Sequence, residues 1–273
     1  MSGGGRGAGA GGREGKEGLP ERGGEAEVEL LLGPHAVREA LRAGRRKVRR
    51  IFLARDLRDA RFGEIVAQAG RIGIPVRQVL RDRLAALAGT DRHQGIIAVA
   101  DPFAYADPDE VAAQAKSRSP LPLLVALDGI EDPHNLGAIL RTAEVFGADG
   151  IFLPKHRAAA VTASVLRAAS GAAEHLPIAR VTNLAAWLDR VKALGYWVCG
   201  ADVERGLPVG QADLARPLAL VVGAEHRGMR PGIRERCDLL VTIPMAGRLE
   251  SLNASVAAGI LLYEIQRQRL PPA

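Results

Sequence analysis

The chain has 273 residues, which is long enough for two domains that each bury a core of their own. Hydrophobic residues make up 47% and charged residues 25%, a composition that excludes a disordered chain and is normal for a globular protein. The 37 Lys and Arg residues exceed the 31 Asp and Glu residues, and the resulting formal charge of +6 is modest, so its placement matters more than its size.

Cysteine usage and apolar runs exclude several classes of protein. Cys199 and Cys237 lack CxxC spacing, which argues against a disulfide scaffold and against a zinc ribbon. The histidines are scattered, so we expect no metal site. No apolar run reaches the roughly 18–20 residues of a membrane span, and the N-terminus lacks a secretory signal. We therefore expect a cytoplasmic protein with no membrane partner.

The N-terminal part predicts a tail followed by a small α/β domain. Eleven of the first 24 residues are Gly, so residues 1–28 are predicted to be a disordered tail. Residues 29–101 predict a small α/β domain that begins with a strand, a turn at Gly33-Pro34 and a helix up to Gly44. Further strands are expected at 50–54, 74–79 and 95–100, and helices at 56–69 and 81–88. Residues 102–122 contain four prolines around a short helical pattern and predict a linker.

From Leu123 onward, strand and helix patterns alternate. The apolar run 123–127 is typical of a strand buried on both faces. Strands follow at 150–153, 176–179, 196–200, 218–223 and 239–243, and helices at 136–146, 162–170, 184–194 and 251–268. This alternation predicts that residues 123–273 form a parallel sheet covered on both faces. Ligands bind such folds at the carboxyl ends of strands, here after Leu127, Val222 and Ile243.

Three segments at those strand ends carry candidate chemistry. Residues 127–143 contain Asn135 near a helix start and Arg141 within an apolar stripe, where we expect a buried guanidinium paired with an anion. That anion is either a neighbouring carboxylate such as Glu144 or a phosphate. Residues 220–229 hold two glycines, which permit a close backbone approach or a positive φ, with Glu225 between them. Residues 243–259 run from a strand end into a helix rich in small residues.

Together these segments resemble the three signature motifs of the SPOUT superfamily of knotted methyltransferases, in its TrmH-type 2′-O-ribose branch. The nearest resemblance is to members that methylate a guanosine ribose in bacterial 23S ribosomal RNA. Residues 33–41 and 93–96 also resemble the N-terminal RNA-binding domain of those members. The resemblance runs from about Leu30 to the C-terminus.

The resemblance implies a trefoil knot in the C-terminal domain, a homodimer, and S-adenosylmethionine as the methyl donor. It implies that Gly223, Ile243 and Leu252 hold this cofactor, largely through backbone groups. The catalytic residues that it implies are Arg141, Asn135, Glu225, Ser251 and Asn253. Because arginine stays protonated, we expect Arg141 to clamp a phosphate and stabilise an alkoxide rather than act as a base.

A basic run in the N-terminal domain is the candidate RNA contact. Ten Lys and Arg but only three acidic residues lie between Ala36 and Arg61. We expect five of them to bind RNA phosphates: Arg45, Arg46, Lys47, Arg49 and Arg50. The competing interpretation is a solvated helix face.

Several alternatives stay open from the sequence. One is a tRNA 2′-O-ribose methyltransferase of the same superfamily, and a variant is an rRNA methyltransferase that confers antibiotic resistance. Another is a catalytically silent RNA-binding factor for ribosome assembly. A nucleotide-binding α/β domain is disfavoured, because the chain after Leu127 lacks the required Gly-rich turn.

Overall fold

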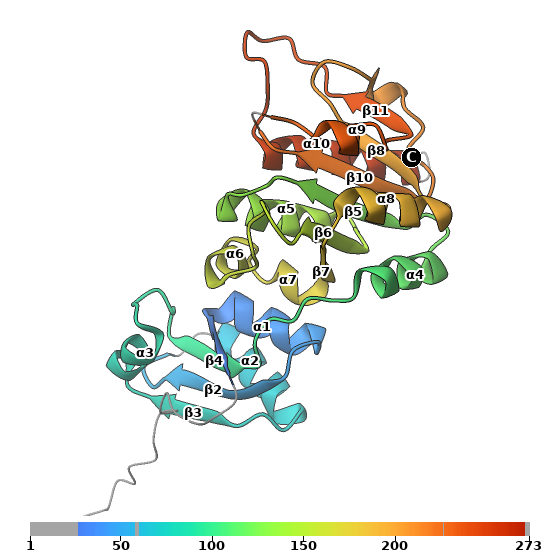
Figure 1. The fold of residues 1–273 in the computed structure, drawn as a ribbon. Coiled ribbons are helices and arrows are strands. Elements are labelled where there is room, and N and C mark those ends of the chain that lie inside the picture. Colours follow the sequence, from blue (N-terminus) through green and yellow to red (C-terminus); the bar gives the residue numbers. More distant parts are fainter. Residues whose placement is uncertain (1–26, 58–59, 226, 271–273) are drawn as a thin grey trace, which may run out of the picture.

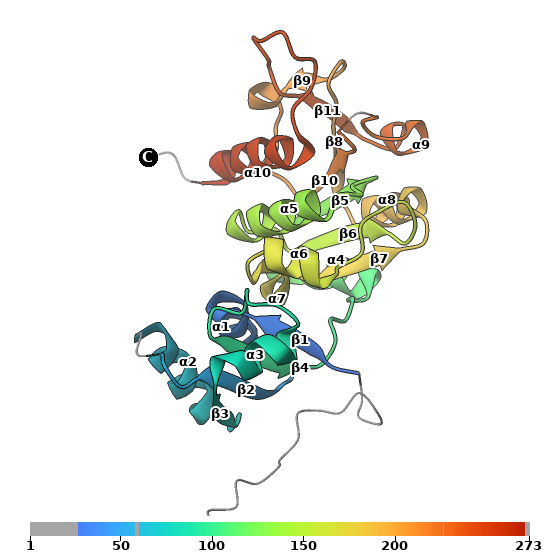
Figure 2. The same cartoon turned by 90° about the vertical axis from the view of Figure 1, so that its left-hand side faces the viewer.

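The structure, a computed structural model, describes residues 27–57, 60–225 and 227–270 (Figure 1). The tail predicted at residues 1–28 lies outside the described residues except for its last two positions. The described chain forms two α/β domains, each built around its own sheet (Figures 1 and 2).

The N-terminal domain contains a four-stranded sheet in the order β1-β4-β2-β3. Only β2 and β3 pair in parallel, and β4 runs antiparallel to both of its neighbours. Two helices cover one face and a third covers the other, because alternate residues of β2 and β4 point to opposite clusters of buried side chains. The elements are β1 (Glu29–Leu32), α1 (Pro34–Ala43), β2 (Val48–Ala54), α2 (Ala60–Arg71), β3 (Val76–Val79), α3 (Arg81–Ala88) and β4 (Ile96–Ala100).

The C-terminal domain contains a seven-stranded sheet in which every pair of neighbours is parallel, as the alternating pattern predicted. The strand order is β7-β6-β5-β10-β8-β11-β9. Figure 2 shows α5, α6 and α10 on one face of the sheet and α4, α8 and α9 on the other. The elements are β5 (Leu123–Asp128), α5 (Pro133–Val145), β6 (Gly150–Pro154), α6 (Ala163–Ala168), α7 (Ala172–His175), β7 (Ile178–Val181), α8 (Leu184–Ala193), β8 (Trp197–Ala201), β9 (Leu207–Pro208), β10 (Leu218–Gly223), α9 (Pro231–Arg234), β11 (Leu239–Thr242) and α10 (Ala254–Arg269).

The segment predicted as a linker contributes to the second core. It contains α4 (Pro108–Arg118), whose residues Val111, Ala112 and Ala115 are buried against the C-terminal sheet. The hydroxyl of Tyr196 donates a hydrogen bond to the carbonyl of Ala112 at 2.8 Å. The segment therefore connects the domains only over its first residues, because its second half packs as a covering helix.

Short elements are the main difference from the sequence prediction. The pattern did not predict α7, α9 or β9, which span four, four and two residues and are too short to show a period. Helix α5 begins at Pro133, three residues before the predicted start, because the Asp132 carboxylate caps it by accepting from the His134 amide at 3.0 Å.

Charged side chains join α1 to α7 across the domain boundary, where the two helices face each other (Figure 1). His175 Nε2 lies 2.9 Å from Glu39 Oε2, and Arg46 lies 3.0 Å from Glu29 and 3.6 Å from Glu174. A Cβ at Gly171 would come within 2.7 Å of Glu39, so glycine allows this close approach. Burial raises the pKa of Glu174, and the positive charge of Arg46 offsets part of that effect.

Candidate active site

Three loops converge at the carboxyl edge of the C-terminal sheet. The first follows β5, the second follows β10, and the third runs from Ile243 to Asn253 after β11. Strands β5 and β10 are direct neighbours, with Val222 opposite Leu127 and Gly223 opposite Asp128. The loops that carry the first two motifs therefore begin side by side, as expected for the ligand-binding edge of a parallel sheet.

Asn253 connects all three motifs. Its Oδ1 accepts hydrogen bonds from the Ser255 amide at 3.0 Å and from the Ser255 hydroxyl at 2.7 Å, so it caps α10. Its Nδ2 donates to Asn135 Oδ1 at 3.0 Å and to Glu225 Oε2 at 3.1 Å. Asn135 lies in the first turn of α5, where Asp132 provides the cap and leaves the Asn135 amide available. The three predicted residues thus form one polar cluster.

Arg141 corrects one expectation from the sequence. The apolar stripe of Leu136, Ile139 and Leu140 is buried, but Arg141 points away from it and its side chain is exposed. Position 141 follows Leu136 by five residues, or about 140° around a helix, so it falls outside the buried face. Within the described part of the chain, no hydrogen bond or ion pair engages its guanidinium, so neither Glu144 nor another carboxylate neutralises it.

The loop after β10 is a tight turn fastened to β5. Ala224 and Gly228 exchange two backbone hydrogen bonds, of 3.1 and 2.8 Å, and Gly228 has a φ of 60°. A Cβ at Gly223 would overlap the backbone of Gly228 and Met229. The first glycine of the motif therefore makes room for the returning chain, and the second supplies the left-handed conformation.

Sequence reasoning missed the ion pair that fastens this loop. The buried carboxylate of Asp128, at the end of β5, accepts from the backbone amide of Arg230 at 2.8 Å. It also accepts from the Arg230 side chain at 2.7 Å from Nε and 2.6 Å from the terminal nitrogen. An acidic residue at the end of an otherwise apolar strand, directly before Gly129, was the available signal.

The third loop offers backbone groups to a ligand. In the described residues, the backbone of residues 244–252 makes no hydrogen bond with other protein groups. Ile243 and Leu252 are half-buried at the two ends of this loop, and Ser251 is half-buried beside Leu252. Free amides and carbonyls between apolar side chains suit a cofactor that is held mainly through the backbone, so the residues present fit the expected donor site.

The basic run divides into residues with different surroundings. Arg46 is buried and forms ion pairs with Glu29 and Glu174. Arg45 donates a hydrogen bond to the carbonyl of His175 at 3.0 Å. Arg49 is paired with Asp101 at 2.6 Å, Arg50 is half-buried and Lys47 is exposed. Arg46 therefore holds the domains together in this structure and is not free to bind phosphate.

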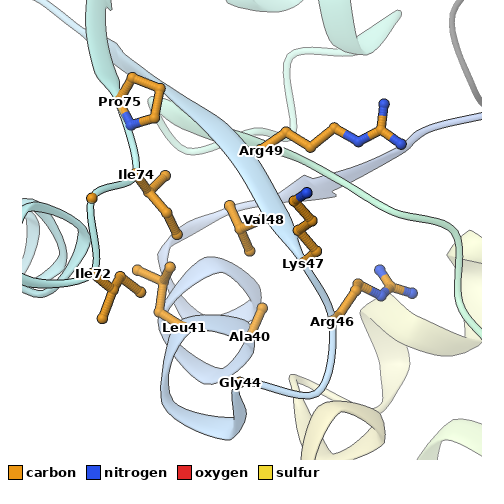
Figure 3. Close-up of a pocket in the computed structure, with 11 residues that line it drawn as sticks. Ala40, Leu41, Gly44, Arg46, Lys47, Val48, Arg49, Ile72, Ile74 and Pro75 are labelled. Carbon is orange, nitrogen blue, oxygen red and sulfur yellow. The ribbon is translucent and has the colours of Figure 1, made fainter.

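Lys47 and Arg49 border a groove of about 560 Å³ in the N-terminal domain (Figure 3). Its apolar lining includes Leu41, Ile72 and Ile74, and Arg46 points away from this apolar group (Figure 3). All residues that line the groove belong to the N-terminal domain.

Two kinds of feature are absent from residues 27–57, 60–225 and 227–270. No helix there combines the length and the apolar character that crossing a bilayer requires. No three His, Cys, Asp or Glu side chains there are grouped so that they could ligate a metal ion.

Family models match both domains. Residues 122–263 match the SpoU rRNA Methylase family, and residues 30–106 match the RNA 2′-O ribose methyltransferase substrate-binding domain. A relative from Bacillus subtilis, named as a TrmH family tRNA/rRNA methyltransferase, is 41% identical over 89% of this chain and 97% of its own length. A relative of the same family name from Staphylococcus saprophyticus is 40% identical over the same shares.

Two solved structures are similar to the chain over most of its length. The AdoMet-bound rRNA methyltransferase from Sinorhizobium meliloti has a TM-score of 0.73 and 26% identity, covering 89% of this chain and 88% of that one. The SpoU methyltransferase AviRb from Streptomyces viridochromogenes, in complex with AdoMet, has a TM-score of 0.72 and 28% identity over 89% and 90%. The chain accordingly belongs to the SpoU rRNA methylase family, of TrmH type, and is an RNA methyltransferase.

Proposed function

We propose that the protein transfers a methyl group from S-adenosylmethionine to the ribose 2′-hydroxyl of a guanosine in 23S ribosomal RNA. The main support for this proposal is that the side-chain amide of Asn253 donates hydrogen bonds to both Asn135 and Glu225. The exposed Arg141 lies on the same helix as Asn135 and lacks a protein partner within the described residues. A polar cluster and an exposed cation on one helix suit the recognition of a ribose and its phosphate.

S-adenosylmethionine supplies an electrophilic methyl group when it is bound. Gly223, Ile243 and Leu252 would hold it, with the unpaired backbone of residues 244–252 providing the hydrogen bonds. The parallel sheet and its three loops are consistent with the trefoil knot that family membership implies. In this proposal the knot brings the loops after β10 and β11 to the same molecule of S-adenosylmethionine.

The protein residues act by positioning and by charge. Methyl transfer is an in-line displacement, so the ribose oxygen must be held about 3 Å from the methyl carbon. Arg141 holds the phosphate of the target nucleotide and stabilises the ribose oxygen as its proton passes to solvent, because a guanidinium stays charged and cannot act as the base. Asn253, oriented by Glu225, fixes the amide of Asn135. Ser251 provides a hydroxyl near the C-terminal end of the loop from Ile243 to Asn253.

Ribosomal RNA is favoured over tRNA by the extent of the structural match. The AdoMet-bound rRNA methyltransferase aligns with 89% of this chain, including the N-terminal domain. The TrmH/SpoU tRNA modifying enzyme of A. aeolicus aligns with 59%, at a TM-score of 0.51. Substrate choice in this proposal depends on the N-terminal domain. Its proposed first contacts for folded RNA are Lys47, the groove that Lys47 borders, and Arg50.

We also propose a homodimer. The outer faces of α5 and α10 expose four apolar side chains: Val145, Val256, Ile260 and Tyr263. Tyr263 packs edge-on against Phe146 with ring centroids 6.1 Å apart, so the two helices present one apolar surface. A second copy of this chain would cover it, and light scattering of the purified protein would measure the oligomeric state.

The decisive experiment maps 2′-O-methylation on 23S ribosomal RNA and on tRNA from cells with and without the gene. We expect one guanosine of 23S ribosomal RNA to lose its methyl group. Loss of a tRNA methylation instead would refute the ribosomal substrate. If neither RNA changes and calorimetry detects no S-adenosylmethionine binding, the protein is a catalytically silent assembly factor and the enzymatic proposal is wrong.

A further inference from the structure

A second cationic surface lies at the carboxyl edge of the C-terminal sheet. Lys155, His156 and Arg157 follow β6 directly and are all exposed, and we name these three residues the cationic loop. Within the part of the chain that the structure describes, none of their side chains forms a hydrogen bond or ion pair. Residues 150–173 contain no Asp or Glu, and they add a further exposed cation at Arg167.

The backbone of the cationic loop is firmly held. The amide of Lys155 donates to the carbonyl of Val181 at 2.9 Å, and the carbonyl of Lys155 accepts from Arg180 at 2.6 Å. Arg180 also lies 5.2 Å from the ring centroid of Tyr105, whose hydroxyl accepts from the Val161 amide at 2.8 Å. The chain is thus held at Lys155 and again at Val161, four residues after the loop.

Arg157 has a φ of 57°, a conformation that residues other than Gly seldom adopt. The anchors at Lys155 and Val161 maintain it, and the loop therefore presents its cations from a held backbone. Groups that are already ordered lose less entropy when they bind a ligand.

The cationic loop is attached to the motif that carries Asn135 and Arg141. The amide of Ala159 donates to the carbonyl of Ile130 at 2.8 Å, in the loop that leads into α5. Helix α6 then packs directly on α5, where a Cβ at Gly137 would overlap Ala168. Gly137 lies between Asn135 and Arg141, so the segment after β6 follows the helix that bears both residues.

The same segment continues to the N-terminal domain through α7, which faces α1 (Figures 1 and 2). One stretch of chain therefore runs from the polar cluster at the sheet edge to the domain that matches the substrate-binding family. The exposed cations of residues 150–173, a segment whose own sequence has no Asp or Glu, suit a polyanion that contacts both domains.

We infer that the cationic loop binds the phosphate backbone of the RNA beside the nucleotide being methylated. This inference rests on the proposed function and adds to it a phosphate-binding surface in the catalytic domain. Lys155 and Arg157 carry the phosphate contacts, and the RNA then extends over α6 toward the N-terminal domain. The sequence alone does not identify these residues as an RNA contact, because three basic or titratable residues after a strand usually form a solvated turn.

The test compares two double variants of the full-length protein. Lys155→Gln with Arg157→Gln removes the two cations and keeps the chain length of both side chains. Arg118→Gln with Arg190→Gln removes two exposed cations near the ends of α4 and α8, at the amino edge of the sheet. Unlike Lys155 and Arg157, these two have local partners, Gln114 at 3.3 Å from Arg118 and Asp109 at 3.0 Å from Arg190. For both we would measure affinity for a transcript of 23S ribosomal RNA against salt concentration, the KM and kcat of methyl transfer, and S-adenosylmethionine binding by calorimetry.

We expect the first variant to raise the KM for RNA about 10-fold and to keep kcat and S-adenosylmethionine affinity within about 2-fold. The reason is that the lost phosphate contacts bind the RNA equally well in the ground state and in the transition state. The slope of log affinity against log salt should fall by about 2, or about 1 for each phosphate contact. The control variant should match the wild type.

Equal effects in both variants, or a wild-type KM and slope in the first, would overturn the inference. In either case the wild-type enzyme would still methylate RNA. Failure of the wild type to bind S-adenosylmethionine or to methylate any RNA would instead refute the proposed function, so the two failures are distinguishable.

Discussion

The side-chain amide of Asn253 donates a hydrogen bond to Asn135 Oδ1 at 3.0 Å, although 118 positions separate the two residues. This contact joins the start of α10 to the first turn of α5. Because the same nitrogen also donates to Glu225, a single side chain fixes the relative positions of all three motifs. The site is consequently sensitive to a change at Asn253 in two separable ways.

Replacing Asn253 should separate its capping role from its role in the cluster. Asn253→Ala should lower the free energy of unfolding by about 1 kcal/mol, because it removes the helix cap, and should also reduce methyl transfer strongly. Asn253→Ser keeps a capping oxygen but loses the donor to Asn135 and Glu225. Thermal melting and a methyl-transfer assay should show near-wild-type stability and low activity for Asn253→Ser. Full activity of that variant would contradict the role of the cluster.

Arg141→Ala should remove turnover without damaging the fold. The guanidinium is exposed and has no partner within the described residues, so the free energy of unfolding should stay within about 0.5 kcal/mol of the wild type. The rate of methyl transfer should fall at least about 100-fold, the usual cost of losing one donor that stabilises a developing oxyanion. Calorimetry should give nearly unchanged S-adenosylmethionine affinity. Near-normal turnover would remove Arg141 from the mechanism.

Gly223→Ala should open the turn after β10. The new Cβ would overlap the backbone of Gly228 and Met229, which cannot move without breaking the hydrogen bonds between Ala224 and Gly228. We expect S-adenosylmethionine affinity to fall at least about 10-fold in calorimetry. Gly210→Ala is the matched control, because nothing lies within 4 Å of a Cβ at that position. Equal affinities for the two variants would mean that this turn does not shape the donor site.

Glu39→Gln should destabilise the domain interface in a pH-dependent manner. Burial raises the pKa of Glu39, but hydrogen bonds from His175 and Arg38 and the charge of Arg42 outweigh it, so the pKa lies below the usual 4.5. A carboxyl group whose pKa is lowered by folding stabilises the protein above its unfolded pKa, and this stabilisation is lost as the pH falls through the folded value.

Urea denaturation of wild type and Glu39→Gln at several pH values tests this assignment. The wild type should be more stable at pH 7 by about 1 kcal/mol, the usual contribution of such a hydrogen bond. The difference should shrink as the pH falls below 4.5. A difference that is constant, or that grows in acid, would show that the Glu39 charge does not hold the interface.

The sequence by itself determined the class of fold and the members of the polar cluster. The apolar run at 123–127 predicted a central strand, and β5 is buried along its whole length with neighbours on both sides. The boundaries of α3 and β10 also agree with the prediction, since strong local patterns depend only on neighbouring residues. The resemblance of three sequence motifs to a known family predicted Asn135, Glu225 and Asn253 as site residues.

Only the tertiary structure decided which charges are free. Arg46, Arg49 and Lys47 are nearly adjacent in sequence, yet Glu174 and Asp101, from distant elements, occupy the first two and leave Lys47 exposed. Arg141 is exposed rather than buried because helix rotation places it off the apolar stripe. Pairing energy depends on the distance between charges in space, and a sequence pattern carries no information about which carboxylate folding brings within 4 Å.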